Sequence, residues 1–251
     1  MKYRVFYITA LLLASVAGCT LEDHGMPTEN VRIVKRERVG YGVYRYTHDV
    51  MNRLATEIFE PAVMITPFDV AFTGFTADNR LANAVENFPA PLNDLGHEVQ
   101  RAADGKIERI RKYCVGGPTC TSGIWYFTYP SANVVEVKFW DNGSLFRGTD
   151  AYTFNSAGQI AEIRHYNASD ELTTTTAHLT FDDKRNMLSF YPEGYLTMPA
   201  SNNNVVDFTV TNHLTSDITS ASYAYEYNAQ GWVTKRTRTG FAAELLEYEA
   251  Y

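Results

Sequence analysis

Two nine-residue stretches of the sequence follow one pattern, and this repeat constrains the fold more than any other feature. Residues 152–160 read YTFNSAGQI and residues 225–233 read YEYNAQGWV, so that two aromatic residues, an Asn, a Gly and a β-branched residue recur at equal spacing. Side chains two positions apart share one face of a β-strand, and Gly adopts the positive φ that a tight reversal needs. Each stretch is therefore predicted to form a β-hairpin that turns at the Gly.

Looser copies of this pattern run through most of the chain. After Gly, Asn is the residue best suited to the left-handed conformation of a tight reversal. The expected turns are Asn52, Asn79, Gly105, Asn133, Gly158, Asn186, Asn204 and Gly231. Six of the seven intervals between these turns are 25 to 28 residues long, and one is 18 residues long. A period of this size indicates a repeat architecture.

The repeat length determines the expected architecture. A unit of about 27 residues accommodates two strands and two turns, and one such hairpin cannot bury its apolar face alone. Eight hairpins in series are therefore expected to pair edge to edge. The predicted fold is all-β: an antiparallel meander in a strongly curled or barrel-like sheet, which forms a single domain over residues 30–251. Curling also removes exposed strand edges, which promote aggregation.

Three segments refine this prediction. Asn142 and Gly143 carry the signature of a type I′ turn and predict a further hairpin. Residues 192–204 contain two Pro and three Asn and are predicted to form a long loop. Residues 51–64 are compatible with an amphipathic helix, but the repeat passes through them and favours a strand.

The first residues resemble a bacterial lipoprotein signal. Lys2 and Arg4 precede a short apolar run, which is typical of a cleaved secretory signal and too short for a membrane-spanning helix of roughly 20 residues. The run ends in VAGC, which resembles the lipobox, whose Cys becomes lipidated and N-terminal. We expect a signal peptide over residues 1–18, lipidation of Cys19 and a polar tether over residues 19–29. An ordinary signal peptide with a chance Cys is the alternative.

The lipid makes a membrane the first expected partner. Three acyl chains would form a permanent anchor, since each buried methylene contributes about 0.8 kcal/mol. By analogy with lipoprotein sorting, Thr20 after the Cys directs the protein to the outer membrane. Glu22 and Asp23 resemble the surface-export signal of Bacteroides-type lipoproteins, which slightly favours the cell surface over the periplasmic side.

The repeats, taken in order, resemble known families. They are similar to the YD-type repeat of Rhs-like proteins, with Asn155 and Asn228 in place of its Asp. More closely, the chain resembles an uncharacterised family of Bacteroides-type outer-membrane lipoproteins, a domain of unknown function with a porin-like, curled β-fold. The resemblance covers residues 97–251. Its matching segments are residues 103–110, 152–163, 180–188, 203–208 and 223–237. It implies a fold and a location, but no activity.

The composition argues against nucleic-acid binding. The chain has a formal net charge of −7, whereas nucleic-acid-binding proteins carry a basic footprint. The basic runs at residues 35–38 and 235–238 form no broad patch, because side chains alternate between the two faces of a strand. These runs are predicted to lie on solvated strand faces, and no nucleic-acid partner is expected.

The two remaining cysteines are Cys114 and Cys120, separated by VGGPT. Disulfides persist in exported proteins, and Gly-Gly-Pro suits a tight loop. We therefore predict a Cys114–Cys120 disulfide, with two free thiols as the alternative. No cofactor and no metal site are expected, because structural zinc needs four ligands at familiar spacings.

Motifs for catalysis are missing from the sequence. It contains neither a nucleophile elbow nor a phosphate-binding loop. A glycosidase would need two carboxylates brought together by the fold, which makes a hydrolase the least favoured function.

Aromatic residues offer the remaining indication of function. Trp232 follows Gly231 and points away from Val233, so it is a candidate exposed aromatic for stacking on a sugar; packing over the sheet edge is the alternative. The favoured function is a binding or accessory lipoprotein for a glycan, a peptide or a protein. The alternative is a carrier that holds an apolar ligand inside the curled sheet.

Overall fold

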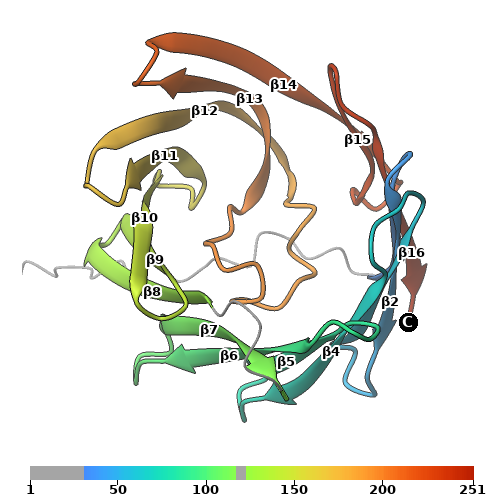
Figure 1. The fold of residues 1–251 in the computed structure, drawn as a ribbon. Helices are drawn as coiled ribbons and strands as arrows, with labels where there is room; N and C mark the ends of the chain where they lie inside the picture. Colours follow the sequence, from blue (N-terminus) through green and yellow to red (C-terminus); the bar gives the residue numbers. More distant parts are fainter. Residues whose placement is uncertain (1–30, 117–122) are drawn as a thin grey trace, which may run out of the picture.

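The computed structural model describes residues 31–116 and 123–251, which form sixteen antiparallel strands and no helix. The strands are β1 Val31–Arg38, β2 Gly42–His48, β3 Leu54–Pro61, β4 Phe68–Phe75, β5 Leu81–Asn87, β6 Asp94–Arg101, β7 Ile107–Val115, β8 Gly123–Ser131, β9 Val134–Asp141, β10 Leu145–Phe154, β11 Ile160–Asn167, β12 Leu172–Arg185, β13 Asn203–Asn212, β14 Asp217–Tyr227, β15 Val233–Arg238 and β16 Glu244–Ala250. Each strand pairs with the next, and β1 pairs with β16, so the sheet closes into a barrel (Figure 1). The prediction of an all-β meander with a barrel-like sheet is confirmed.

Closure depends on the pairing of the first and last strands. Val31 lies opposite Ala250 and Arg38 lies opposite Glu244, with one register shift after Ile33. The other edge of β1 pairs with β2. No strand of the described barrel therefore keeps an open edge, which is the hazard that open sheets face.

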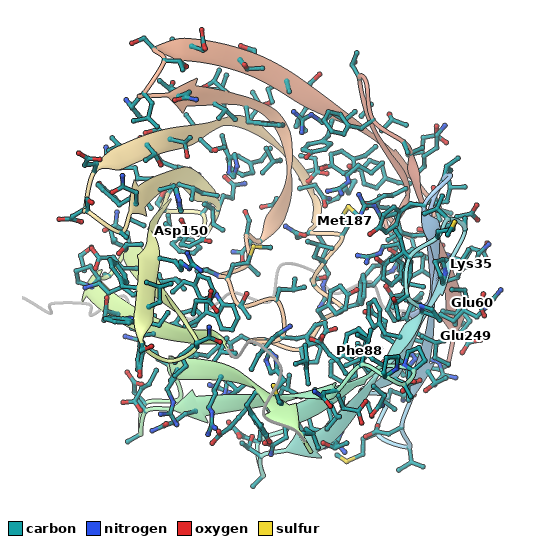
Figure 2. All side chains as sticks on the ribbon, in the orientation of Figure 1. Lys35, Glu60, Phe88, Asp150, Met187 and Glu249 are labelled. Atoms are coloured by element: carbon teal, nitrogen blue, oxygen red, sulfur yellow. The ribbon has the colours of Figure 1, made fainter. Side chains whose placement is uncertain are left out.

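Strand alternation divides the side chains between a mainly apolar interior and a mainly charged exterior. In β2, Tyr44 is buried and the next residue, Arg45, is exposed. Figure 2 shows the same division, with Lys35 and Glu60 outside the ring and Met187 inside it. The hydrophobic core is therefore the inside of the barrel.

Ion pairs between neighbouring strands cover the outer face. The outward pairs are Arg32–Glu249, Lys35–Glu247, Arg45–Glu60, Arg111–Glu98 and Lys235–Glu226. The apolar positions between these charged residues turn inward.

Seven of the eight expected repeat turns lie where one strand ends and the next connection begins. They follow the even-numbered strands β2 to β14 and so lie at one rim of the barrel: Asn52, Asn79, Gly105, Asn133, Gly158, Asn186 and Gly231. Five of them, Asn52, Asn79, Gly105, Gly158 and Gly231, have φ between 58° and 85°. At the opposite rim, Asn142 and Gly143 have φ of 50° and 68°, as a type I′ hairpin requires.

The expected reversal at Asn204 is wrong. Asn204 is buried within β13, where its side chain accepts a hydrogen bond from the Met187 backbone N–H at 2.7 Å and donates to Asp182 at 2.8 Å. The chain does not turn at Asn204. The interval of 18 residues between Asn186 and Asn204 corresponds to an inserted loop and not to a further repeat.

This insertion, residues 186–202, is called the inner loop. It connects β12 to β13 and runs into the interior of the barrel (Figure 1, orange). It includes most of the loop expected at residues 192–204. Met187 and Tyr191 belong to the buried core. Residues 54–61, in contrast, form strand β3, as the repeat favoured over a helix.

The predictions for the signal peptide, the tether and Cys19 concern residues outside the described part of the chain. Cys114 lies in β7, and Cys120 also falls outside the described residues. The Cys114–Cys120 disulfide and the lipidation of Cys19 remain predictions.

Candidate binding site inside the barrel

The inner loop is held by a buried polar contact to β2 and β3. The Tyr191 hydroxyl donates a hydrogen bond to Glu57 and lies 3.1 Å from the Tyr46 hydroxyl. Glu57 is 3% exposed, and burial raises its pKa although the nearby Arg36 guanidinium and the Tyr191 hydroxyl act in the opposite sense. A buried carboxylate needs such partners, so this contact fixes the loop against the wall.

A second contact holds the middle of the loop to β6. His97 Nε2 lies 3.1 Å from the Gly194 carbonyl oxygen. Because a carbonyl only accepts, Nε2 carries a hydrogen and donates it in this contact. His97 is 1% exposed, and burial, helped by the charge of Lys112, lowers its pKa to about 4. The Tyr195 ring packs 5.7 Å from the imidazole.

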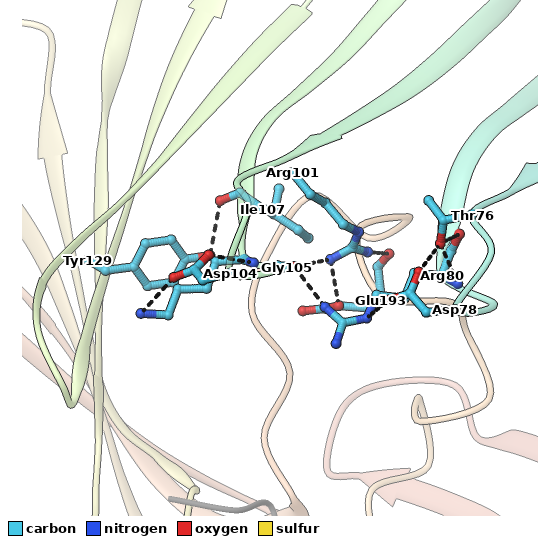
Figure 3. A network of polar contacts seen from close by, with 10 residues as sticks. Thr76, Asp78, Arg80, Arg101, Asp104, Gly105, Ile107, Tyr129 and Glu193 are labelled. Atoms are coloured by element: carbon cyan, nitrogen blue, oxygen red, sulfur yellow. Dashed lines mark hydrogen bonds and ion pairs between the residues drawn. The ribbon is translucent and has the colours of Figure 1, made fainter. Parts of the chain in front are cut away.

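A third contact joins the loop to the rim. Arg101 binds the Glu193 carboxylate at 2.8 Å and also donates to the Gly105 carbonyl at 3.1 Å, as Figure 3 shows. Arg80, which follows the neighbouring turn, donates to the same Gly105 carbonyl at 2.8 Å. The loop is thus tied at three points, and the space beside it is bounded by fixed walls.

A cavity of about 280 Å³ lies between the start of the inner loop and strands β12 to β15. Its lining combines aromatic, apolar and basic side chains. The lining residues are Thr176, His178, Asn186, Met187, Leu188, Asn204, Val205, Phe208, Tyr223, Tyr225, Arg236 and Arg238. This volume lies just below the usual range of ligand cavities, which begins at about 300 Å³, so the cavity suits a small molecule.

Two arginines two positions apart on β15 supply the charge of this first cavity. Arg236 Nη2 forms an ion pair with Glu244 Oε2 at 2.7 Å. Arg238 has no carboxylate within 4 Å among the residues that the structure describes. Its guanidinium instead lies 5.1 Å from the centre of the Phe208 ring and 4.3 Å from that of Phe241.

His178 is the histidine of the first cavity. Its Nδ1 lies 2.5 Å from the Ile160 carbonyl oxygen and therefore donates the hydrogen. Burial lowers the pKa of His178, although the hydrogen bond to Ile160 acts in the opposite sense. The ring is thus neutral near pH 7, and the two arginines are the cationic side chains of this lining.

A second cavity of about 240 Å³ lies near the end of the inner loop, against β8 to β11. Trp125 and Phe139 stack in its wall with ring centres 4.8 Å apart. His165 hydrogen-bonds to Asp150, and Arg147 lies 2.6 Å from Asp141. Its charged groups therefore already have partners.

Neither cavity shows the arrangement that a glycosidase needs. Among the described residues that line the two cavities, Asp150 is the single carboxylate, whereas glycoside hydrolysis uses a pair. Asp182, one of the carboxylates available in the sequence, accepts hydrogen bonds from Asn204 and Lys184 backbone N–H groups and so supports the local fold.

Trp232 does not project into solvent as a free aromatic. Its ring is partly buried, 5.5 Å from that of Tyr248, and the Arg185 guanidinium lies 5.3 Å above it. The expectation of an exposed stacking platform is wrong, because the residue packs where β15 begins. The alternative of packing over the sheet is the one that the structure shows.

Sequence reasoning missed the two arginines of the first cavity. The run at residues 235–238 was expected to be solvated, and Lys235 does face outward, 2.6 Å from Glu226. Arg236 and Arg238 face inward. Strand alternation contained this signal, but the sequence did not show which face was the interior.

The described residues hold no group of three His, Cys, Asp or Glu side chains placed to bind a metal ion. Within the same residues, no helix has the length and apolar character that crossing a membrane requires.

Comparisons with known proteins identify relatives in structure only. No protein-family model matches the chain, and no curated protein matches it. A porin-like protein from Bacteroides vulgatus superimposes with a TM-score of 0.54 at 12% identity, over 86% of this chain and 98% of that one. A porin-like protein from Bacteroides uniformis gives a TM-score of 0.42 at 10% identity, over 90% of this chain and 98% of that one. The first of these likenesses shows that the fold is a porin-like barrel.

Proposed function

We propose that this chain is a lipid-anchored protein of the outer membrane whose barrel binds a small ligand in its interior. One observation carries the proposal. Aromatic side chains line two cavities that the fixed inner loop leaves between itself and the wall. Concave, largely apolar spaces with a few placed polar groups are the usual form of ligand sites. Binding rather than catalysis is the role that this arrangement supports.

The outer face supports a barrel that lies in water beside the membrane. Membrane-spanning barrels carry an apolar band outside, and a Lys or Arg facing lipid at the midplane costs about 2–4 kcal/mol. Here Arg45, Arg111 and Lys235 face outward within their strands, each beside a carboxylate. A lipid on Cys19 would then provide the attachment that the strands do not.

The anchor is tested by replacing Cys19. In the native host, the wild-type chain is expected to incorporate labelled palmitate and to fractionate with outer membranes. Cys19→Ala is expected to lose the label and to leave the membrane fraction, whereas Cys120→Ala should keep both. Membrane association of Cys19→Ala at the wild-type level would contradict the proposed attachment.

Binding inside the barrel is tested with two variants that fill the cavities. A chain lacking residues 1–19 keeps the complete strand pairing of the barrel. This chain is screened by thermal shift against fatty acids, small aromatic acids and alcohols, and short glycans. A ligand of the interior is expected to raise the melting temperature, because it binds the folded state alone. Thr176→Trp, in the first cavity, or Leu196→Trp, in the second, should abolish that increase.

Thr209→Trp is the matched control, because Thr209 lies between the inward residues Phe208 and Val210 and faces outward on β13. The ligand-induced shift should be the same in this variant as in the wild type. A shift that survives both cavity-filling variants, or no shift with any ligand class, would contradict binding in the interior.

A further inference from the structure

We propose that the first cavity binds a small amphipathic carboxylate. Arg238 would receive the carboxylate, and the rings of Phe208 and Tyr223 would contact its flat apolar body. This inference rests on the proposed function and names the ligand class for one of the two cavities.

The state of Arg238 is the first reason. Its guanidinium is partly buried, and Phe208, Tyr223 and Phe241 place their ring centres 5.1, 5.9 and 4.3 Å from it. Aromatic faces attract a cation but leave its N–H donors without acceptors. Among the described residues no carboxylate lies within 4 Å of Arg238, so its in-plane donors are available to a ligand.

The neighbouring arginine shows the contrast. Arg236 faces the same cavity and is paired with a carboxylate, that of Glu244, at 2.7 Å. It adds positive potential while keeping its partner. Arg238 is therefore the arginine to which the carboxylate of a ligand would bind. A planar guanidinium binds a planar carboxylate through two parallel hydrogen bonds.

The rest of the lining excludes other ligand classes. None of the described residues that line the first cavity is acidic, so a cationic ligand finds no carboxylate there and a neutral sugar finds few acceptors for its hydroxyl groups. Three polar side chains of the lining already have hydrogen-bond partners. The Tyr225 hydroxyl donates a hydrogen bond to the Val205 carbonyl at 2.9 Å, and the side chains of Asn186 and Asn204 each form a hydrogen bond with a backbone group. Met187 and Leu188 provide apolar surface opposite the arginines.

The second cavity offers no comparable cation. Its arginine, Arg147, already lies 2.6 Å from Asp141, and Asp150 contributes a negative charge of its own. An anionic ligand is therefore expected to select the first cavity. This difference makes the site assignment testable.

Methionine methyl groups report on the two cavities separately. Met187 lines the first cavity and Met198 lines the second. We would titrate 3-phenylpropionate into the chain lacking residues 1–19, carrying ¹³C-methyl methionine, and follow both resonances. The Met187 resonance is expected to shift with saturation while the Met198 resonance stays in place. The neutral 3-phenylpropanamide, which has the same shape, is expected to bind at least tenfold more weakly.

Variants of β15 test the role of the charge. Arg238→Gln is expected to weaken 3-phenylpropionate binding at least tenfold, and Arg238→Lys, which keeps the charge without the planar fork, should weaken it by a smaller factor. Lys235→Gln is the matched control: it removes a positive charge from the same strand on the outer face, and binding should be unchanged. The comparison of acid and amide on the wild-type chain stands even if an Arg238 variant does not fold.

The outcomes separate this inference from the proposed function. Equal affinities for the acid and the amide, unchanged binding by a folded Arg238→Gln variant, or a shift of Met198 in place of Met187 would each overturn the carboxylate site. Each of these outcomes would still leave a ligand bound inside the barrel. If neither methionine responds to any ligand class of the thermal-shift screen, interior binding fails as a whole.

Discussion

Replacement of Gly148 by Ala is expected to lower the free energy of unfolding by about 4 kcal/mol, from backbone strain and overpacking together. Gly148 lies in β10 at a register shift against β9, with φ of 148°. A Cβ at this position would lie 2.2 Å from the Tyr166 carbonyl oxygen in β11. That oxygen belongs to the backbone of a paired strand and cannot turn away, so the two strands would have to separate.

Gly40→Ala is the matched control for this effect. Gly40 also has a positive φ, 76°, but a Cβ there meets no atom within 4 Å. Its substitution is therefore expected to cost about 1 kcal/mol, the strain of the left-handed conformation alone. Urea denaturation of both variants measures the difference. Equal losses of stability would show that the close approach to β11 is not the cause.

Acid is expected to destabilise the barrel through His97. The pKa of His97 is about 4 in the folded state, against 6.5 ordinarily. Below pH 6.5 the unfolded chain takes up a proton that the folded chain refuses until near pH 4. The stabilisation is thus complete above pH 6.5 and is lost as the pH falls through this window. It amounts to about 3 kcal/mol for a shift of this size.

Burial of the His97 ring is the main cause of this loss, and the charge of Lys112 adds to it, whereas the hydrogen bond to the Gly194 carbonyl acts in the opposite sense. Lys112 lies opposite on β7, and the Gly194 carbonyl and the Tyr195 ring face it from the inner loop. A proton on the ring would add a buried charge beside a cation. Protonation should therefore favour release of the inner loop.

A non-titrating variant isolates the contribution of His97. Urea denaturation between pH 7.5 and pH 4 should show a smaller loss of stability in His97→Gln than in the wild type, whereas His213→Gln should follow the wild type, since His213 is exposed. His48 and His178 also have lowered pKa values, so the difference between chains is the quantity to compare. Parallel curves for the wild type and His97→Gln would contradict the assignment.

The local part of the fold could be predicted because each hairpin is specified within a few residues. Gly158 and Gly231 follow aromatic pairs that share a strand face, and both adopt the positive φ that their position in the repeat implied. Asn52 and Asn79 also adopt a positive φ, although Asn tolerates this conformation less readily than Gly. Alternation and turn chemistry operate over short distances, so the sequence displays them directly.

The remaining features depend on contacts between distant residues. Asn204 looks like a turn residue, yet Asp182 and Met187 hold it inside a strand. Trp232 is covered by Tyr248, which belongs to another strand. The cavity around Arg238 exists because the sheet closes and the inner loop enters it. No local pattern in the sequence encodes which strand face becomes the interior.

The pairing of β1 with β16 also has a kinetic consequence. The ion pair between Arg32 and Glu249 joins residues that are 217 positions apart in the chain. Contacts of such long range form late and slowly, and β16 is made after all the other strands. Until β16 pairs with β1, the incomplete sheet exposes two unpaired strand edges to which other chains can bind. Cellular factors that shield nascent polypeptides should therefore matter most in the last stage of its assembly.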